Sequence, residues 1–140
     1  MAPLSPRLQL GLLLLLTTIL LFPSPQADYV WDDASLILRN PNLQAPTLDW
    51  LLRGDLWAGI GESSAHFYRP LMLLSLLVDR ALGLGPFGAQ LHSLGWHLLS
   101  VGLLVTLLRR HVRPEAALLG GVLLALHPMQ SSIVRFVAAR

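Results

Sequence analysis

Residues 87–108 read FGAQLHSLGWHLLSVGLLVTLL, and this stretch decides the fold. It carries no charged side chain, and about 20 consecutive apolar residues are enough for a helix to cross a bilayer. Gln90, His92 and His97 lie in its first half, whereas the second half is almost purely aliphatic. We therefore predict a membrane-spanning helix over 87–110. Its polar side chains are expected to pack between helices, because the two histidines are not spaced four apart like a helical metal-binding pair.

Two further apolar runs flank this helix. Residues 1–26 contain LQLGLLLLLTTILLF and predict a first membrane helix. The alternative for this run is a cleavable signal peptide with a cut after Ala27, although Pro25 would then be a poor residue three positions before the cut. Residues 114–140 predict a third membrane helix, which Pro128 kinks or ends, followed by the start of an outer segment.

The composition also indicates a membrane protein. Of the 140 residues, 54% are hydrophobic and only 13% are charged, whereas soluble domains have roughly 25% charged residues. The absence of cysteine excludes disulfides and thiolate metal sites. All ten basic residues are arginine, they are scattered, and the formal net charge is only +2, so no nucleic-acid partner is predicted.

The segment between the first two apolar runs, residues 27–86, is predicted to be an outer loop of short helices joined by turns. Thr47 is placed to cap one such helix, and Gly54 is placed to end it. A longer apolar helix is predicted over residues 71–84. It contains Asp79 and is too short to cross the membrane, so we expect it to lie at the membrane surface.

The distribution of charge predicts the orientation in the membrane. Residues 28–68 hold six acids and two arginines, whereas residues 109–115 hold three arginines and one acid. Basic loops stay in the cytoplasm, so the N-terminus is predicted inside and the acidic loop on the periplasmic or lumenal side. The expected fold is an all-α, multi-pass membrane protein with about three transmembrane helices. An outer acidic loop carries short interfacial helices.

Three stretches together carry a resemblance to a known family. They are YVWDDASLILRNPNL (29–43), FYRPLMLLSLLVDRALGLGPFGAQLHSLGWHLL (67–99) and ALLGGVLLALHPMQSSIVRFVAAR (117–140). Their order resembles the N-terminal part of GT-C-type membrane glycosyltransferases, and in particular the transmembrane and tetratricopeptide-repeat O-mannosyltransferases and their bacterial relatives. The resemblance covers residues 28–140. It implies a piece of a larger multi-span fold, because the tetratricopeptide repeats and many further spans are not in this sequence.

The resemblance implies a glycosyltransferase whose donor is a polyprenyl-phosphate-linked sugar, such as mannose. The acceptor would be a hydroxyl of a protein, at serine or threonine, or of a glycan. An acidic pair in the first outer loop would hold the catalytic base, and Asp32 and Asp33 match it. From the residues alone, the pair could instead cap and start the helix that follows. A second carboxylate could also hold a divalent cation, although no metal site is predicted.

Four other residues are candidates for the site. Arg69 could bind the phosphate of the donor bidentately, or anchor the chain at the membrane surface. Tyr68, His127 and Gln130 could line the site, or could be ordinary interfacial and helix-end residues. One departure concerns the residues after His127 and Pro128, where relatives show a His-Thr-Glu-like triplet and this chain has Gln130, Ser131 and Ser132.

Two other functions stay open on the sequence alone. The chain could be a non-catalytic small membrane protein with an interaction or assembly role that keeps the fold. It could also be a lipid-interacting protein that starts with a signal peptide.

Overall fold

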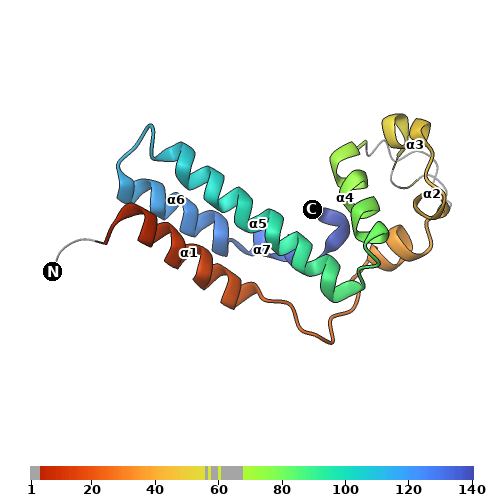
Figure 1. Cartoon of the computed structure of the whole chain (residues 1–140), viewed down its shortest axis with the longest axis horizontal. Helices are drawn as coiled ribbons and strands as arrows, with labels where there is room; N and C mark the ends of the chain where they lie inside the picture. Colours follow the sequence, from red (N-terminus) through yellow and green to blue (C-terminus); the bar gives the residue numbers. More distant parts are fainter. Residues whose placement is uncertain (1–3, 56, 58–59, 61–67) are drawn as a thin grey trace.

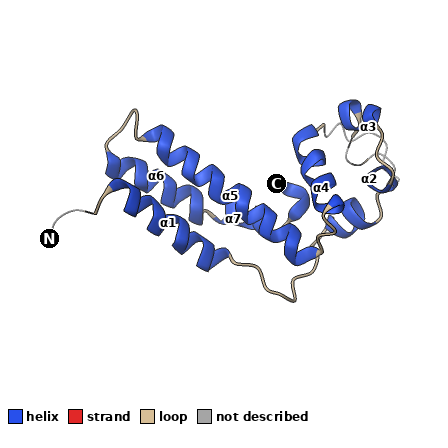
Figure 2. Ribbon diagram, in the orientation of Figure 1, coloured by secondary structure: helices blue, strands red, loops and turns tan. Residues whose placement is uncertain are grey.

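The computed structural model describes residues 4–55, 57, 60 and 68–140 of the chain. Every regular element in these residues is a helix, and the ribbon contains no strand (Figure 2). The prediction of an all-α fold is therefore confirmed for the described part of the chain.

Three apolar helices form a bundle at one end of the molecule: α1 (Pro6–Leu21), α5 (Pro86–Leu108) and α6 (Pro114–Leu126). They lie side by side along the long axis, and the chain runs through α5 in the direction opposite to α1 and α6 (Figure 1). Arg109 at the end of α5 donates a hydrogen bond from Nη2 to the carbonyl oxygen of Pro6, at 2.8 Å. The start of α1 and the arginine-rich connection after α5 therefore lie at the same end of the bundle.

Small residues allow the bundle helices to approach closely. Ala117, Gly121 and Ala125 are spaced four apart on α6 and are buried. A Cβ atom added at Gly121 would lie 2.3 Å from Cγ2 of Val105 and 3.0 Å from Cδ2 of Leu13, so a larger residue would force Val105 or the helices to shift. Packing through small residues is typical of helices in membranes, where the lipid removes the hydrophobic drive for association.

Large apolar side chains point away from the bundle on all three helices. The exposed side chains include Leu8, Leu12, Leu15, Leu16, Ile19, Leu20, Leu99, Leu103, Leu107, Leu119 and Leu123. An arrangement with small residues inside and leucines outside is suited to a lipid environment.

The lengths of the helices support fewer spans than the sequence predicts. Within the described residues, α5 with 23 residues is the one helix long and apolar enough to cross a membrane by itself. α6 and α7 (Pro128–Arg135) qualify together as a second span, but they are bent by 54° at His127–Pro128. α1 has 16 residues, about 24 Å of helix, against the roughly 30 Å of a bilayer core. The arrangement of three spans therefore stays a prediction.

Short helices form a second core at the other end of the molecule (Figure 1). They are η1, a π-helical turn (Ala34–Leu38), α2 (Pro41–Gln44), α3 (Leu48–Arg53) and α4 (Pro70–Ala81). Leu36, Leu43, Trp50, Leu73 and Leu76 are buried there. Val137 and Ala138 belong to the same core. The core therefore joins segments that are up to 102 positions apart in the sequence, from Leu36 to Ala138.

The ends of α3 follow the predicted local signals. The hydroxyl of Thr47 accepts a hydrogen bond from the backbone N–H of Trp50, at 3.2 Å, and Gly54 follows the last residue of the helix. Both predicted ends are confirmed.

α4 ends slightly earlier than the predicted 71–84, because Gly83 adopts a φ of +64° in the turn after the helix. The backbone N–H of Leu84 then bonds back to the carbonyl oxygen of Asp79, at 2.9 Å. Glycine is favoured in this left-handed helix-ending conformation. α4 is therefore a single helix followed by a tight turn, as predicted, although its placement at a membrane surface stays a prediction.

Candidate functional site

The acidic pair lies on a strained turn between α1 and η1. The backbone N–H of Asp33 donates to the carbonyl oxygen of Val30, at 3.0 Å, and Trp31 within this turn has a φ of +51°. This left-handed conformation is rare for a bulky side chain and must be held by its surroundings. The indole of Trp31 is largely exposed and packs edge-on against Phe136, with ring centroids 5.3 Å apart.

Asp33 is fully buried and binds backbone N–H groups. Its Oδ1 accepts from Ala138, at 2.8 Å, and its Oδ2 accepts from Val137, at 3.1 Å, and from Val30, at 3.4 Å. The carboxylate makes no capping hydrogen bond to η1, the helix that follows it. For Asp33, the alternative that its side chain caps the helix that follows it is therefore wrong. Instead, the side chain holds η2, the 3-10 turn at Val137–Ala139.

Two effects act in opposite directions on the carboxyl group of Asp33. Burial raises its pKa above the usual range, because the surrounding protein stabilises the charged form less well than water does. The three backbone N–H groups and the guanidinium of Arg140 lower it, but burial has the larger effect. Nearby, burial and the carboxylates of Asp79 and Asp33 raise the pKa of the Tyr29 phenol.

Asp32 differs from its neighbour in exposure. Its side chain is exposed, and within the described residues no hydrogen bond or ion pair to its carboxylate is present. Its backbone carbonyl oxygen accepts from the N–H of Leu36, at 2.8 Å, and so belongs to η1. Of the two acids, Asp32 is therefore the one that an incoming group can reach.

A buried charged cluster links α4, α5 and Arg140, the residue that follows η2. Oδ1 of Asp79 lies 2.5 Å from Nδ1 of His92, and Oδ2 pairs with the guanidinium of Arg140. Since a carboxylate only accepts, Nδ1 of His92 carries the proton in this contact. Arg140 also donates to the carbonyl oxygen of Ala89, at 3.4 Å, and to the hydroxyl of Ser93, at 3.5 Å. The packing of polar side chains between helices is confirmed here, and also for His97, which bonds the carbonyl oxygen of Ala125 at 3.1 Å.

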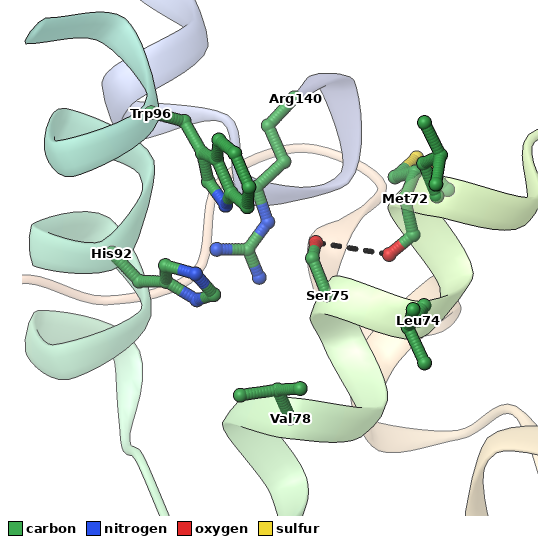
Figure 3. A pocket seen from close by; sticks show the side chains of 8 residues that line it. Met72, Leu74, Ser75, Val78, His92, Trp96 and Arg140 are labelled. Carbon is green, nitrogen blue, oxygen red and sulfur yellow. Dashed lines mark hydrogen bonds between the residues drawn. The ribbon is translucent and has the colours of Figure 1, made fainter. Parts of the chain in front are cut away.

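An open cavity of about 450 Å³ lies between α4 and α5, beside this cluster. Figure 3 shows His92 and Trp96 on one wall, Ser75 and Val78 on the other, and the guanidinium of Arg140 between them. Leu71, Met72 and Leu74 complete a mostly apolar lining. The shape and lining suit part of an apolar chain.

The other candidates make no hydrogen bond or ion pair to the acidic pair in the described residues. Arg69 is exposed at the start of α4, and Tyr68 beside it is exposed. His127 is exposed at the start of α7, where its Nδ1 accepts from the N–H of Met129, at 3.3 Å. Gln130 is exposed one turn further on. Within the described residues, no hydrogen bond or ion pair joins these four side chains to Asp32 or Asp33, so their roles stay predictions.

The divalent cation considered from the sequence finds no obvious ligand set. Among the residues that the structure describes, no three histidine, aspartate or glutamate side chains are grouped so that they could hold a metal ion. A cation at Asp32 would therefore need ligands from elsewhere, such as the substrate.

Sequence reasoning missed the long-range partners of the buried polar residues. Asp79 pairs with Arg140, which lies 61 positions further along the sequence. Gln90 donates from Nε2 to the carbonyl oxygens of Asp28, at 3.1 Å, and Arg135, at 3.4 Å. The available signal was the presence of polar residues on otherwise apolar helices, which marks positions facing protein but does not identify the partner.

The fold and the site define a helical protein with an apolar bundle and, at one end of it, a buried polar cluster and a turn that carries an exposed carboxylate. Comparison with known proteins agrees with the resemblance. The chain is 29% identical over 141 residues to human Protein O-mannosyl-transferase TMTC4, which covers 84% of this chain and 18% of that protein. The mouse protein of the same name is 28% identical over the same shares. Human Protein O-mannosyl-transferase TMTC3 is 28% identical over 116 residues, covering 80% of this chain and 13% of that protein.

These similarities support a relation to this group of O-mannosyl-transferases. The chain spans less than a fifth of the length of these relatives. No family model matches the sequence, and no solved structure matches it.

Proposed function

We propose that the chain is the catalytic N-terminal part of a GT-C-type membrane glycosyltransferase. It transfers a sugar, such as mannose, from a polyprenyl-phosphate donor to a hydroxyl group of a protein acceptor. The observation that carries the proposal is the exposed carboxylate of Asp32, held on a strained turn by the buried Asp33, in a chain similar to protein O-mannosyl-transferases. The relatives supply the class of reaction, and the geometry supplies the candidate base.

In the proposed reaction, Asp32 takes the proton of the acceptor hydroxyl. The acceptor oxygen attacks the anomeric carbon of the sugar while the bond from that carbon to the phosphate oxygen breaks. The lipid phosphate leaves with the bonding electron pair, and Arg69 stabilises its charge. Asp33 does not contact the acceptor in this scheme, because its carboxylate is occupied by three backbone N–H groups.

We place part of the apolar chain of the donor in the cavity between α4 and α5. The cavity is open, its volume is about 450 Å³, and its walls are mostly leucine, methionine, valine and tryptophan side chains. Tyr68, His127 and Gln130 stay candidates for the lining of the remainder of the site.

We further propose a multi-pass membrane protein with its N-terminus in the cytoplasm and Asp32 on the periplasmic or lumenal side. The hydrogen bond from Arg109 to Pro6 supports this topology, because it gathers the basic segments at one end of the bundle. The turn that carries the acidic pair lies at the other end (Figure 1).

A second candidate function is a non-catalytic membrane protein with an interaction or assembly role. One observation favours it: Gln130, Ser131 and Ser132 replace the triplet expected after His-Pro. Such a protein would keep the bundle and the buried cluster but would transfer no sugar.

A transfer assay separates the two. The full-length protein is purified in lipid nanodiscs and given a serine- and threonine-rich acceptor with either a radiolabelled polyprenyl-phosphate mannose or a nucleotide-linked mannose. The enzyme proposal predicts label on the acceptor with the lipid-linked donor and not with the nucleotide donor. No label with either donor, alongside binding of the same lipid, would favour the non-catalytic candidate.

A further inference from the structure

We infer that Asp79 is a positioning residue for the Asp32 site, and that it acts through the C-terminal turn, defined as residues 135–140. No direct contact joins Asp79 to the acidic pair in the described part of the chain. The connection is instead made by two sets of buried polar contacts, one at Arg140 and one at Asp33, joined by the short chain segment from Val137 to Arg140. Its effect on transfer rests on the proposed function, whereas its effect on the structure does not.

The first part of the path fixes Arg140. The side chain of Arg140 is 3% exposed, and the side chain of Asp79, its counter-charge, is 7% exposed. A guanidinium this deeply buried is stable only when it is paired and hydrogen-bonded. The remaining contacts of Arg140, to Ala89 and Ser93, are at 3.4 and 3.5 Å and are at the long end of hydrogen-bond distances. Asp79 is therefore the contact that holds Arg140 inside.

His92 fixes the carboxylate of Asp79 in turn. Its Nδ1 donates to Oδ1, so that Oδ2 is left for Arg140. Figure 3 shows His92 facing Arg140 from α5, across the cavity from Ser75 of α4. Because Asp79 comes from α4 and His92 from α5, the pair also fixes these two helices relative to each other.

The second part of the path connects Arg140 to the acidic pair. Val137 and Ala138 are three and two residues before Arg140, and their N–H groups bind the carboxylate of Asp33. Displacement of Arg140 therefore displaces two of the three donors that hold Asp33. Asp32 is the preceding residue on the same strained turn, so its carboxylate moves with that turn.

Gln90 provides a second, independent connection between the same parts. Its amide donates to Asp28, before the acidic pair, and to Arg135, at the start of the C-terminal turn. This connection does not involve Asp79. Because Gln90 still holds Arg135 when Asp79 is lost, we expect only residues 136–140 to be released.

The structural test is thiol labelling, which is straightforward because the chain has no cysteine. Ala138→Cys places a probe in the C-terminal turn, and Ala125→Cys places one in the bundle; both alanines are buried. In nanodiscs, Asp79→Asn should raise the labelling rate at position 138 by about tenfold or more, as expected for local opening, and leave position 125 protected. Asp49→Asn, which removes a carboxylate from an exposed ion pair with Arg53, is the matched control and should change neither rate.

Protection at position 138 that survives Asp79→Asn would overturn the inference. If Asp79→Asn instead exposes both probes, the protein has unfolded as a whole, and Arg140→Gln decides the matter. That variant keeps the contact between His92 and Asp79 but removes the guanidinium. Release of position 138 alone in Arg140→Gln supports the inference, and protection or exposure of both probes contradicts it.

The activity test uses the full-length protein and a double-mutant cycle. Asp79→Asn should lower kcat by about tenfold to a hundredfold, the range expected when a catalytic group is misplaced by about 1 Å. In the Asp33→Asn background it should cause little further loss, since both residues act through the same turn. If the double variant loses kcat by the product of the two single losses, Asp79 does not act through Asp33, and the inference is contradicted. An inactive wild type with the predicted labelling pattern would instead remove the proposed function and leave the structural coupling in place.

Discussion

Asp32 and Asp33 are adjacent in the sequence, yet their surroundings are opposite. Asp33 is buried and receives three backbone N–H groups, whereas Asp32 is exposed. The strained φ of Trp31 sets this arrangement, because it turns the chain so that one carboxylate faces the C-terminal turn. The proposed division of roles, with Asp32 as base and Asp33 as anchor, follows from this difference.

The pKa of Asp33 leads to a prediction about stability and pH. Because burial raises this pKa in the folded protein, the folded state binds the proton more tightly than the unfolded state does. The stability from this effect is fully present below the ordinary value of 3.8 and is lost as the pH rises through the raised value. The quantity to follow is the difference in the free energy of unfolding between the wild type and Asp33→Asn. We expect this difference to decrease as the pH rises from 3.8 through the raised pKa of Asp33.

The measurement is reversible unfolding in mild detergent at a series of pH values from 3 to 7. Asp28→Asn serves as a control, because Asp28 is exposed and its carboxylate bonds only the adjacent backbone N–H of Tyr29 in the described residues. A difference that increases with pH would mean that the hydrogen bonds to the carboxylate outweigh its burial.

At the level of the elements, the sequence predicts what is encoded locally. The helix predicted over 87–110 is found as Pro86–Leu108, and the cap at Thr47, the stop at Gly54 and the break at Pro128 are found as well. Each depends on residues within a few positions of the feature, where propensity and capping act. The π-helical form of η1 was not predicted.

The partners of buried polar groups could not be predicted in the same way. Asp33 and Ala138 are 105 positions apart, and Asp79 and Arg140 are 61 apart. A charged residue on an apolar helix shows that a buried acid needs a partner. Any of several arginines could be that partner, and only the folded structure shows which one it is. For the same reason, the sequence identified Asp32 and Asp33 as candidates but could not tell which of them is exposed.

The bundle gives a prediction about glycine. Gly121→Ala places a methyl group 2.3 Å from Cγ2 of Val105, so either the side chain of Val105 or the helix α6 must shift. We expect the free energy of unfolding to fall by about 1–3 kcal/mol, the usual cost of overpacking. Gly102→Ala on α5 is the matched control, because its added Cβ meets nothing within 4 Å. Helix propensity should make that variant as stable as the wild type or more stable, by up to about 1 kcal/mol.

Unfolding monitored by circular dichroism in detergent compares the two glycine variants directly. Equal stabilities for Gly121→Ala and Gly102→Ala would show that α6 does not pack against α5 at this crossing.

At the scale of the whole molecule, the two ends have different chemistry. One end gathers the start of α1 and the arginines after α5, and the other carries the acidic turn and the short helices (Figure 1). In a membrane, this polarity predicts that the acidic end lies outside and the basic end in the cytoplasm. α4, with 12 residues and about 18 Å of helix, would lie along the outer surface.

Labelling of single cysteines in intact membranes tests this topology. Ala45→Cys in the outer loop should react with an impermeant maleimide, whereas Val112→Cys between α5 and α6 should react only after the membrane is opened. Ser63 also belongs to the predicted outer loop and could carry the probe, but it lies outside the described residues. Ala45 is described and exposed, so it is the better position. The predicted topology places one membrane crossing, α5, between the two sites. Reaction of both sites from the same side of the membrane would contradict it.

The central claim is that Asp32 is the base of a glycosyl transfer reaction, and one measurement tests it most directly. The Asp32→Asn variant of the full-length protein is assayed with labelled polyprenyl-phosphate mannose, beside the Asp49→Asn variant, which loses an exposed carboxylate elsewhere. We predict that Asp32→Asn lowers turnover by at least about 10²-fold, as expected for loss of a general base, while binding of the lipid donor is retained. Turnover in Asp32→Asn that equals that of the wild type and of Asp49→Asn would contradict the claim.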